Sequence, residues 1–186
     1  METAERLYTA DEFLARDWEL HRWEELIDGR IVLTTPKLRH QQAVGRIYAA
    51  LLRWSEEGAG FGIASISLDL RIDDRNVLAP DVLWYADTTH PGLDVPAQLL
   101  PPQLVVEVRS PSTWKRDRGV KRERYEAWGV QELWLVDTQT GTVVVHRRGA
   151  SDAPGFDTTL EVGHDELLRS PILPGFELPA RSVFAV

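Results

Sequence analysis

Two apolar segments joined by a helical one constrain the fold more than any other feature of this sequence. Residues 103–109 and 132–137 are rich in valine and leucine and have the length of buried strands. Residues 113–128 between them have the spacing of a helix, which ends at Gly129. Because strand–helix–strand connections are right-handed crossovers, we expect two parallel neighbouring strands in one sheet.

Shorter patterns predict the remaining elements. Thr9, with Glu12 three residues later, forms a capping-box pattern that predicts a short helix. A hairpin is expected over residues 24–34, turning at Asp28-Gly29, followed by a long helix over 39–57. The other expected elements are strands over 66–72, 77–85 (interrupted near Pro80), 142–147 and 156–162, a mostly irregular segment over 86–102, and a short helix over 165–168. This order predicts an α/β fold in which a mixed sheet is flanked by helices.

The overall composition limits the possible functions. The length of 186 residues, without repeats, predicts one domain over residues 1–186. A net charge of −8 argues against a non-specific nucleic-acid coat protein, although a local basic patch or bound cation can still offset phosphate charge. The absence of cysteine excludes disulfides and thiolate metal sites and favours a reducing cytoplasm. No apolar run suits a membrane span or a signal peptide, so we expect no membrane association.

Two carboxylates occupy unusual places in apolar segments. Glu107 interrupts a strongly apolar strand, and Asp81 follows Pro80 just before another apolar run. A buried carboxylate has to be neutralised, paired or bound to a metal. Taken alone, Glu107 could form a salt bridge to Arg109 or another base, and Asp81 could be a turn residue. Together on neighbouring strands they offer the oxygen ligands that Mg²⁺ prefers.

These carboxylates belong to a longer ordered set of motifs. The set comprises Pro80-Asp81, residues 104–113, Asp117, Lys121, Tyr125, Gly129-Val130 and residues 133–137. It extends to residues 25–29, 39–41 and 170–175, and so covers nearly the whole chain. In this set the chain resembles the Uma-two family of restriction endonucleases, within the PD-(D/E)XK nuclease superfamily.

The resemblance implies a restriction-endonuclease-like core and a metal-dependent phosphodiesterase site that uses Mg²⁺ or Mn²⁺. It implies that Asp81 and Glu107 are metal ligands and that the Val108 carbonyl adds a third. The superfamily lysine, which helps to activate water, is replaced here by Arg109. Arginine is a poor proton acceptor but can hold a phosphate through two parallel bonds. The resemblance offers Lys121 of the following helix as the substitute, whereas a solvated surface lysine is the ordinary alternative.

Two further residues are candidates for the same site. Glu25 in the hairpin could be a third acid near the metal, or a solvent-facing charge. His40 near the start of the long helix could orient water or bind phosphate, or be a surface histidine. Residues 115–124 hold six bases and two acids, which in an acidic protein is either the best phosphate-facing surface or a solvated helix face.

The sequence supports two functional hypotheses. The first is a Mg²⁺-dependent endonuclease that hydrolyses phosphodiester bonds of nucleic acid, with DNA as the expected substrate. The second, motivated by Arg109, is a non-catalytic nucleic-acid-binding or regulatory module that retains the nuclease fold. A homodimer is expected because two-strand cleavage suits two copies around a two-fold axis. The apolar tail, residues 171–186, could serve that contact or cover the core.

Overall fold

The computed structural model describes residues 6–17, 23–57, 60–86, 94–95, 97–110 and 113–185. Its largest sheet has six strands in the order β10-β9-β8-β7-β6-β3. Their bounds are Ile63–Ile66 (β3), Val82–Tyr85 (β6), Leu104–Val108 (β7), Glu132–Asp137 (β8), Thr142–Arg147 (β9) and Thr158–Val162 (β10). Only β7 and β8 pair in parallel within this sheet, so the predicted crossover is confirmed.

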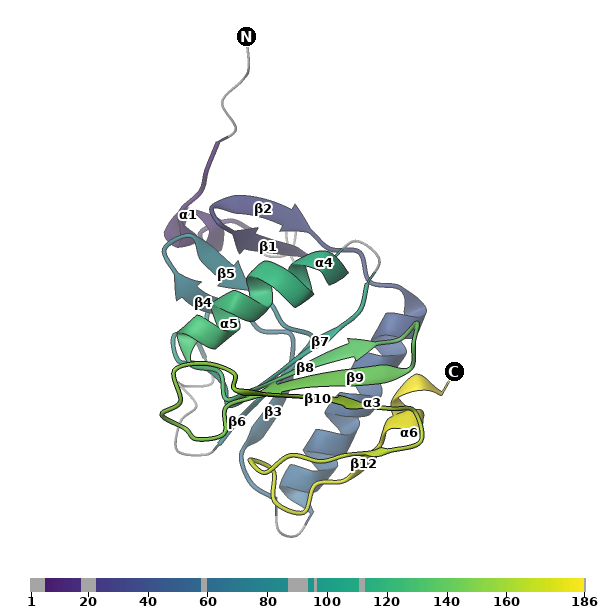
Figure 1. Ribbon diagram of the computed structural model, residues 1–186. Helices are drawn as coiled ribbons and strands as arrows, with labels where there is room; N and C mark the ends of the chain where they lie inside the picture. The colour runs from purple at the N-terminus through teal and green to yellow at the C-terminus, as the bar shows by residue number, and fades with distance from the viewer. Residues whose placement is uncertain are drawn as a thin grey trace.

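Helices cover both faces of the six-stranded sheet (Figure 1). Helix α3 (Leu38–Glu56) packs on the face that carries Val106 and Val108. The opposite face, which carries Val105, packs against a helical run composed of α4 (Trp114–Arg116), the π-helical η1 (Asp117–Lys121) and α5 (Arg122–Trp128). Alternate side chains of β7 therefore enter different cores, which explains why this strand is apolar on both faces.

A second sheet of four strands holds the N-terminal part of the chain, in the order β2-β1-β5-β4. Its strands are Glu24–Ile27 (β1), Arg30–Leu33 (β2), Leu70–Asp73 (β4) and Asn76–Leu78 (β5). The predicted hairpin turn is confirmed: Asp28 and Gly29 both have positive φ, as a tight turn between antiparallel strands requires. The predicted capping box also forms at Thr9 and Glu12, at the start of α1 (Ala10–Leu14).

Two predicted elements are wrong. The strand expected over 66–72 divides, because β3 belongs to the six-stranded sheet and β4 to the four-stranded sheet. The helix expected over 165–168 is instead strand β11 (Leu167–Leu168), which pairs with β12 (Leu178–Pro179). The interruption expected near Pro80 within residues 77–85 is confirmed, and it separates β5 from β6, which join different sheets. The two errors concern the choice of pairing partner, which the alternation within a segment does not encode.

The C-terminal segment covers the core. Leu173, Phe176, Leu178 and Val183 are buried in the cluster that α3 helps to form, and helix α6 (Ala180–Phe184) contacts α3. Of the two alternatives for the tail, the core-covering one is therefore found in its described part. The irregular segment expected over 86–102 lies partly outside the described residues, and one domain over residues 1–186 stays a prediction. None of the described helices has the length and apolar character needed to cross a membrane.

Candidate active site

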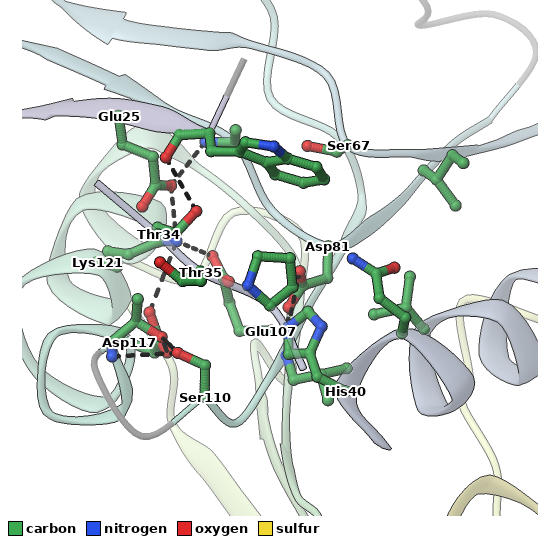
Figure 2. A pocket seen from close by; sticks show the side chains of 18 of the residues that line it. Glu25, Thr34, Thr35, His40, Ser67, Asp81, Glu107, Ser110, Asp117 and Lys121 are labelled. Carbon is green, nitrogen blue, oxygen red and sulfur yellow. Dashed lines mark hydrogen bonds and ion pairs between the residues drawn. The ribbon is translucent and has the colours of Figure 1, made fainter. Parts of the chain in front are cut away.

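The two sheets, the start of α3 and the helical run meet around a cavity of about 170 Å³. Several separate parts of the chain contribute its polar side chains (Figure 2). These include Glu25 of β1, His40 of α3, Asp81 between β5 and β6, Glu107 of β7, and Asp117 and Lys121 of η1. The cavity exists because the chain leaves one sheet at residues 79–81 and joins the other, which opens a space between them.

Lys121 lies at the centre of three carboxylates, which point toward it in Figure 2. Its Nζ is 2.6 Å from Glu107 Oε1, 2.8 Å from Glu25 Oε1 and 3.6 Å from Asp117 Oδ1. Lys121 is only 2% exposed, and the three acids are similarly buried. We call these four residues the lysine cluster; it contains three acids and one base.

The helical run from α4 to α5 contributes two members of this cluster. It is kinked at Gly119, whose φ of −109° and ψ of −107° are not helical. Asp117 and Lys121 lie on either side of this kink and both line the cavity, and Tyr125 one turn later donates a hydrogen bond of 2.7 Å to Glu107 Oε1.

Burial and the excess of acid set the protonation of this cluster. Burial raises the pKa of Glu107 well above its usual value, and the positive charge of Lys121 offsets this only in part. Burial likewise raises the pKa of Asp117. Burial would lower the pKa of Lys121, but the carboxylates of Glu107 and Glu25 raise it well above its usual value. Lys121 is therefore an ammonium ion at neutral pH, and the cluster attracts an additional cation or proton.

Asp81 lines the same cavity and is held by contacts outside the lysine cluster. Its Oδ2 accepts a hydrogen bond of 2.7 Å from the Val108 backbone N–H, and its Oδ1 is 3.2 Å from His40 Nε2. The Asp81 side chain is 21% exposed, so it is more accessible than the acids around Lys121. His40 is buried, and its Nδ1 has no hydrogen-bond partner in the described part of the chain. The described geometry thus orients Asp81 from two directions and leaves it open to the cavity.

The available oxygens suit a hard divalent cation. Among the described residues, Glu107 Oε2 has no hydrogen-bond donor, and Asp81 accepts one hydrogen bond, at Oδ2, while its Oδ1 lies beside His40 Nε2, although a carboxylate oxygen can accept two. No three acidic or histidine side chains in the described ranges converge to hold a metal by themselves. Mg²⁺ commonly uses one or two protein carboxylates and completes its shell with water and substrate phosphate, so Asp81 and Glu107 fit it.

The structure brings together most of the residues predicted for the site. The ones that line this cavity are Asp81, Glu107, Val108, Lys121, Glu25 and His40. Lys121 and Glu25 each had a second interpretation, as a charge on the solvated surface. That interpretation is wrong for both residues, because both side chains are buried. Glu107 has a salt-bridge partner, as the ordinary interpretation required, and that partner is Lys121.

Arg109 is the exception among the predicted site residues. Its Nη1 is 2.6 Å from Asp137 Oδ2, and its guanidinium lies 5.6 Å from the centre of the Trp114 ring. It follows the last residue of β7, where the end of β8 offers an acid, and it does not line the cavity. The basic run over 115–124 also divides: Lys121 points inward, while Arg122 and Arg124 pair with Glu126 and Asp28.

Sequence reasoning assigned no role to Asp117 or Tyr125, although Asp117 belongs to the lysine cluster and Tyr125 contacts it. Asp117 Oδ2 accepts a hydrogen bond of 2.8 Å from Thr113 Oγ1, which in turn lies 2.8 Å from Ser110 Oγ. Residues 111–112 of this segment lie outside the described residues. A signal was available, because residues 117, 121 and 125 recur at intervals of four and therefore share one helix face.

Comparison with known proteins finds a family and a solved structure that are similar to this chain. Residues 10–181 match the family Uma2, described as "Putative restriction endonuclease". A crystal structure described as a putative nuclease belonging to DUF820, from Anabaena variabilis ATCC 29413, is similar with a TM-score of 0.79 and 20% sequence identity; the match covers 95% of this chain and 97% of that one. No curated protein matches the chain. The predicted α/β fold, a mixed sheet flanked by helices with a restriction-endonuclease-like core, is confirmed.

Proposed function

The chain belongs to the Uma2 family, and from this premise we propose that it is a divalent-metal-dependent endonuclease that hydrolyses nucleic-acid phosphodiester bonds, with DNA as substrate. The observation that carries the proposal is the shared cavity of Asp81, Glu107 and Lys121. Two carboxylates and an ammonium ion around one cavity match the needs of phosphodiester hydrolysis, in which negative charge has to be stabilised close to an activated water.

The proposed site assigns the metal ion to two carboxylates and one backbone carbonyl. Asp81, Glu107 and the Val108 carbonyl would hold Mg²⁺ or Mn²⁺. A divalent ion bound there lowers the pKa of a water and stabilises charge on a phosphate oxygen. His40 Nε2 and the Val108 N–H orient the Asp81 carboxylate, because each contacts a different oxygen.

Lys121 would contribute charge and hydrogen bonds. Because the surrounding acids raise its pKa, Lys121 stays protonated and acts as a donor to water or phosphate, not as a proton acceptor. Glu25 fixes its position, since Glu25 Oε1 accepts from both Lys121 Nζ and the Ala79 backbone N–H at 2.8 Å. Arg109 is engaged by Asp137 outside the cavity, so Lys121 is the cationic side chain that this geometry offers in place of the motif's lysine.

The test is cleavage of supercoiled plasmid and of single-stranded DNA and RNA with Mg²⁺ or Mn²⁺. Asp81→Asn and Glu107→Gln should each lower the cleavage rate by at least about 100-fold, since each removes a group that stabilises the transition state. Glu161→Gln is the matched control, because Glu161 is an exposed acid of β10 outside the cavity, and it should cleave like the wild type. Cleavage by Glu107→Gln at the wild-type rate would contradict the proposal.

A binding measurement separates this proposal from the non-catalytic alternative. Calorimetric titration of the wild type should detect Mn²⁺ binding at millimolar concentration or below, and Glu107→Gln should lose it. A wild type that neither binds the metal nor cleaves would favour the binding or regulatory module.

We further propose a homodimer in the cytoplasm, because two-strand cleavage suits two-fold symmetry and the chain lacks cysteine. Light scattering coupled to gel filtration measures the oligomeric state.

A further inference from the structure

Asp117 has bonding capacity that the described structure leaves unused. It is 1% exposed and lines the cavity, and its Oδ1 has no hydrogen-bond partner among the residues that the structure describes. Its other oxygen is firmly held, because Oδ2 accepts from Thr113 Oγ1. A buried polar atom without a partner is costly, and in native proteins such an atom calls for an explanation. Among the described residues, Lys121 Nζ is the cationic group that approaches Oδ1, at 3.6 Å, just beyond hydrogen-bond distance.

Lys121 and a bound metal would compete for the same carboxylate. Lys121 Nζ and Tyr125 OH both contact Glu107 Oε1, at 2.6 Å and 2.7 Å. A divalent cation on Glu107 would withdraw electron density from this carboxylate and repel the ammonium ion. Lys121 has three donors, and two of them are used by Glu107 and Glu25. When the contact to Glu107 weakens, the freed donor needs another acceptor in a site that excludes most water.

We propose that Asp117 is that acceptor: it is a positioning residue that receives Lys121 when a divalent cation takes Glu107. The movement is small, because the distance from Nζ to Asp117 Oδ1 has to shorten from 3.6 Å to about 2.8 Å. Glu25 serves as the fixed point, since the Ala79 N–H holds its Oε1 in place. The inference rests on the proposed metal-dependent function and adds to it a role for Asp117 in making the metal site available.

The test is the Mn²⁺ affinity measured by calorimetry, without substrate or turnover. Asp117→Asn keeps the shape but removes the charge that attracts the ammonium ion, so Lys121 should remain on Glu107. The dissociation constant for Mn²⁺ should then rise by about 10- to 100-fold, the usual effect of losing a group that supports a metal ligand. The matched control is Glu24→Gln, which removes an acid that also lines the cavity but pairs with Arg16. It should change the constant by less than about threefold.

A double-mutant cycle separates an effect through Lys121 from a plain effect of charge. Lys121→Met removes the ammonium ion, so adding Asp117→Asn to it should leave the Mn²⁺ affinity unchanged. If Asp117→Asn weakens binding equally with and without Lys121, the inference is overturned. It is also overturned if Asp117→Asn alone binds Mn²⁺ like the wild type, and in that case the proposed function stands. A wild type that binds no Mn²⁺ overturns both.

A second variant covers the case in which Asp117→Asn does not fold, as judged by circular dichroism. Thr113→Val keeps the charge of Asp117 but removes the hydroxyl that holds Oδ2. The loss of this hydrogen bond should raise the Mn²⁺ dissociation constant by about fivefold. The same substitution in the Lys121→Met background should have no effect. An unchanged constant in the Thr113→Val single variant, or equal changes in both backgrounds, overturns the inference.

Discussion

The lysine cluster and the ion pair of Glu132 are both buried, but they differ in charge balance. Glu132 is fully buried and has one basic partner, Arg147, whose Nε is 2.6 Å from Oε2. Its oxygens also accept from Trp134 Nε1 and Ser170 Oγ, so both are occupied. In the lysine cluster three acids share one base, and two carboxylate oxygens, Asp117 Oδ1 and Glu107 Oε2, have no hydrogen-bond donor among the described residues.

The difference shows what a buried charge contributes to a protein. The Glu132 pair joins β8, β9 and the C-terminal segment, and its charges and hydrogen bonds balance within the protein. The lysine cluster has excess negative charge beside a cavity, so its balance is completed only by a proton or a cation from outside. A buried charge is therefore weak evidence for function, whereas an unbalanced and unsaturated group beside a cavity is stronger evidence.

The largest expected effect on stability concerns the balanced pair. Glu132→Gln should lower the free energy of unfolding by about 3 kcal/mol, because Arg147 is left without its counter-charge in a largely buried place. Glu107→Gln should lower the free energy of unfolding much less, since it removes one acid from a cluster in which three acids share one base. Urea denaturation of both variants measures the difference. Equal losses in the two variants would show that charge balance does not distinguish the clusters.

The second effect concerns stabilisation by metal. At about 100 times its dissociation constant, Mn²⁺ should raise the free energy of unfolding of the wild type by about 2.7 kcal/mol. Glu132→Gln should gain the same increment from its lower starting value, because its cavity residues are unchanged. Glu107→Gln should gain little or nothing. Thermal denaturation with and without Mn²⁺ gives these increments, and Ca²⁺ tests whether the gain depends on the identity of the ion.

The third effect is a pH dependence of stability. A carboxyl whose pKa is higher in the folded than in the unfolded protein binds more protons when folded. Glu107 is such a carboxyl, so its contribution to the free energy of unfolding falls as the pH rises from its usual pKa of 4.5 through its raised pKa in the folded protein. Acidification from about pH 7 to pH 5 should thus stabilise the wild type, by at most about 1.4 kcal/mol per pH unit for each proton taken up.

Variants locate the source of this dependence. Glu107→Gln should flatten the slope, and Glu132→Gln should retain it. Burial raises the pKa of Asp69 to about 6, so Asp69 contributes in the same direction between its usual 3.8 and that value in all three proteins. Denaturation across this pH range at constant ionic strength measures the slopes. A wild-type slope that survives in Glu107→Gln would assign the proton uptake to Asp117 or Asp69.

Much of the fold could be predicted, because several local patterns agree with the tertiary structure. The apolar strand at 104–108, the helix that follows it and the Asp28-Gly29 turn are each specified by nearby residues. Residues 66–72 have an equally regular alternation but divide between two sheets, and Ile66 remains 51% exposed. Which sheet a strand joins depends on its partners: β3 pairs with β6, whereas β4 pairs with β5, and the alternation within residues 66–72 does not distinguish the two.

The candidate site was predictable to a similar degree. Asp81 and Glu107 stand out because acids are rare in apolar runs, and the family pattern added Lys121, Glu25 and His40. The orientation of Arg109 could not be predicted, because it depends on Asp137, which is 28 residues away in sequence. The role proposed for Asp117 could not be predicted either. It rests on the position of its Oδ1 near Lys121, on the absence of a hydrogen-bond partner for that oxygen among the described residues, and on the excess of acids in the cluster.

The smallest expected effect concerns Arg109, which occupies the motif's lysine position but points away from the cavity. Arg109→Lys should change the rate of DNA cleavage by less than about threefold, because the base that contacts Glu107 is Lys121 and partly exposed ion pairs contribute little. Asp137→Asn, which removes the charge that pairs with Arg109, should also change the rate of DNA cleavage by less than about threefold. If instead Arg109→Lys raises cleavage by an order of magnitude or more, a lysine at position 109 can reach the phosphate, and the assignment to Lys121 has to be revised.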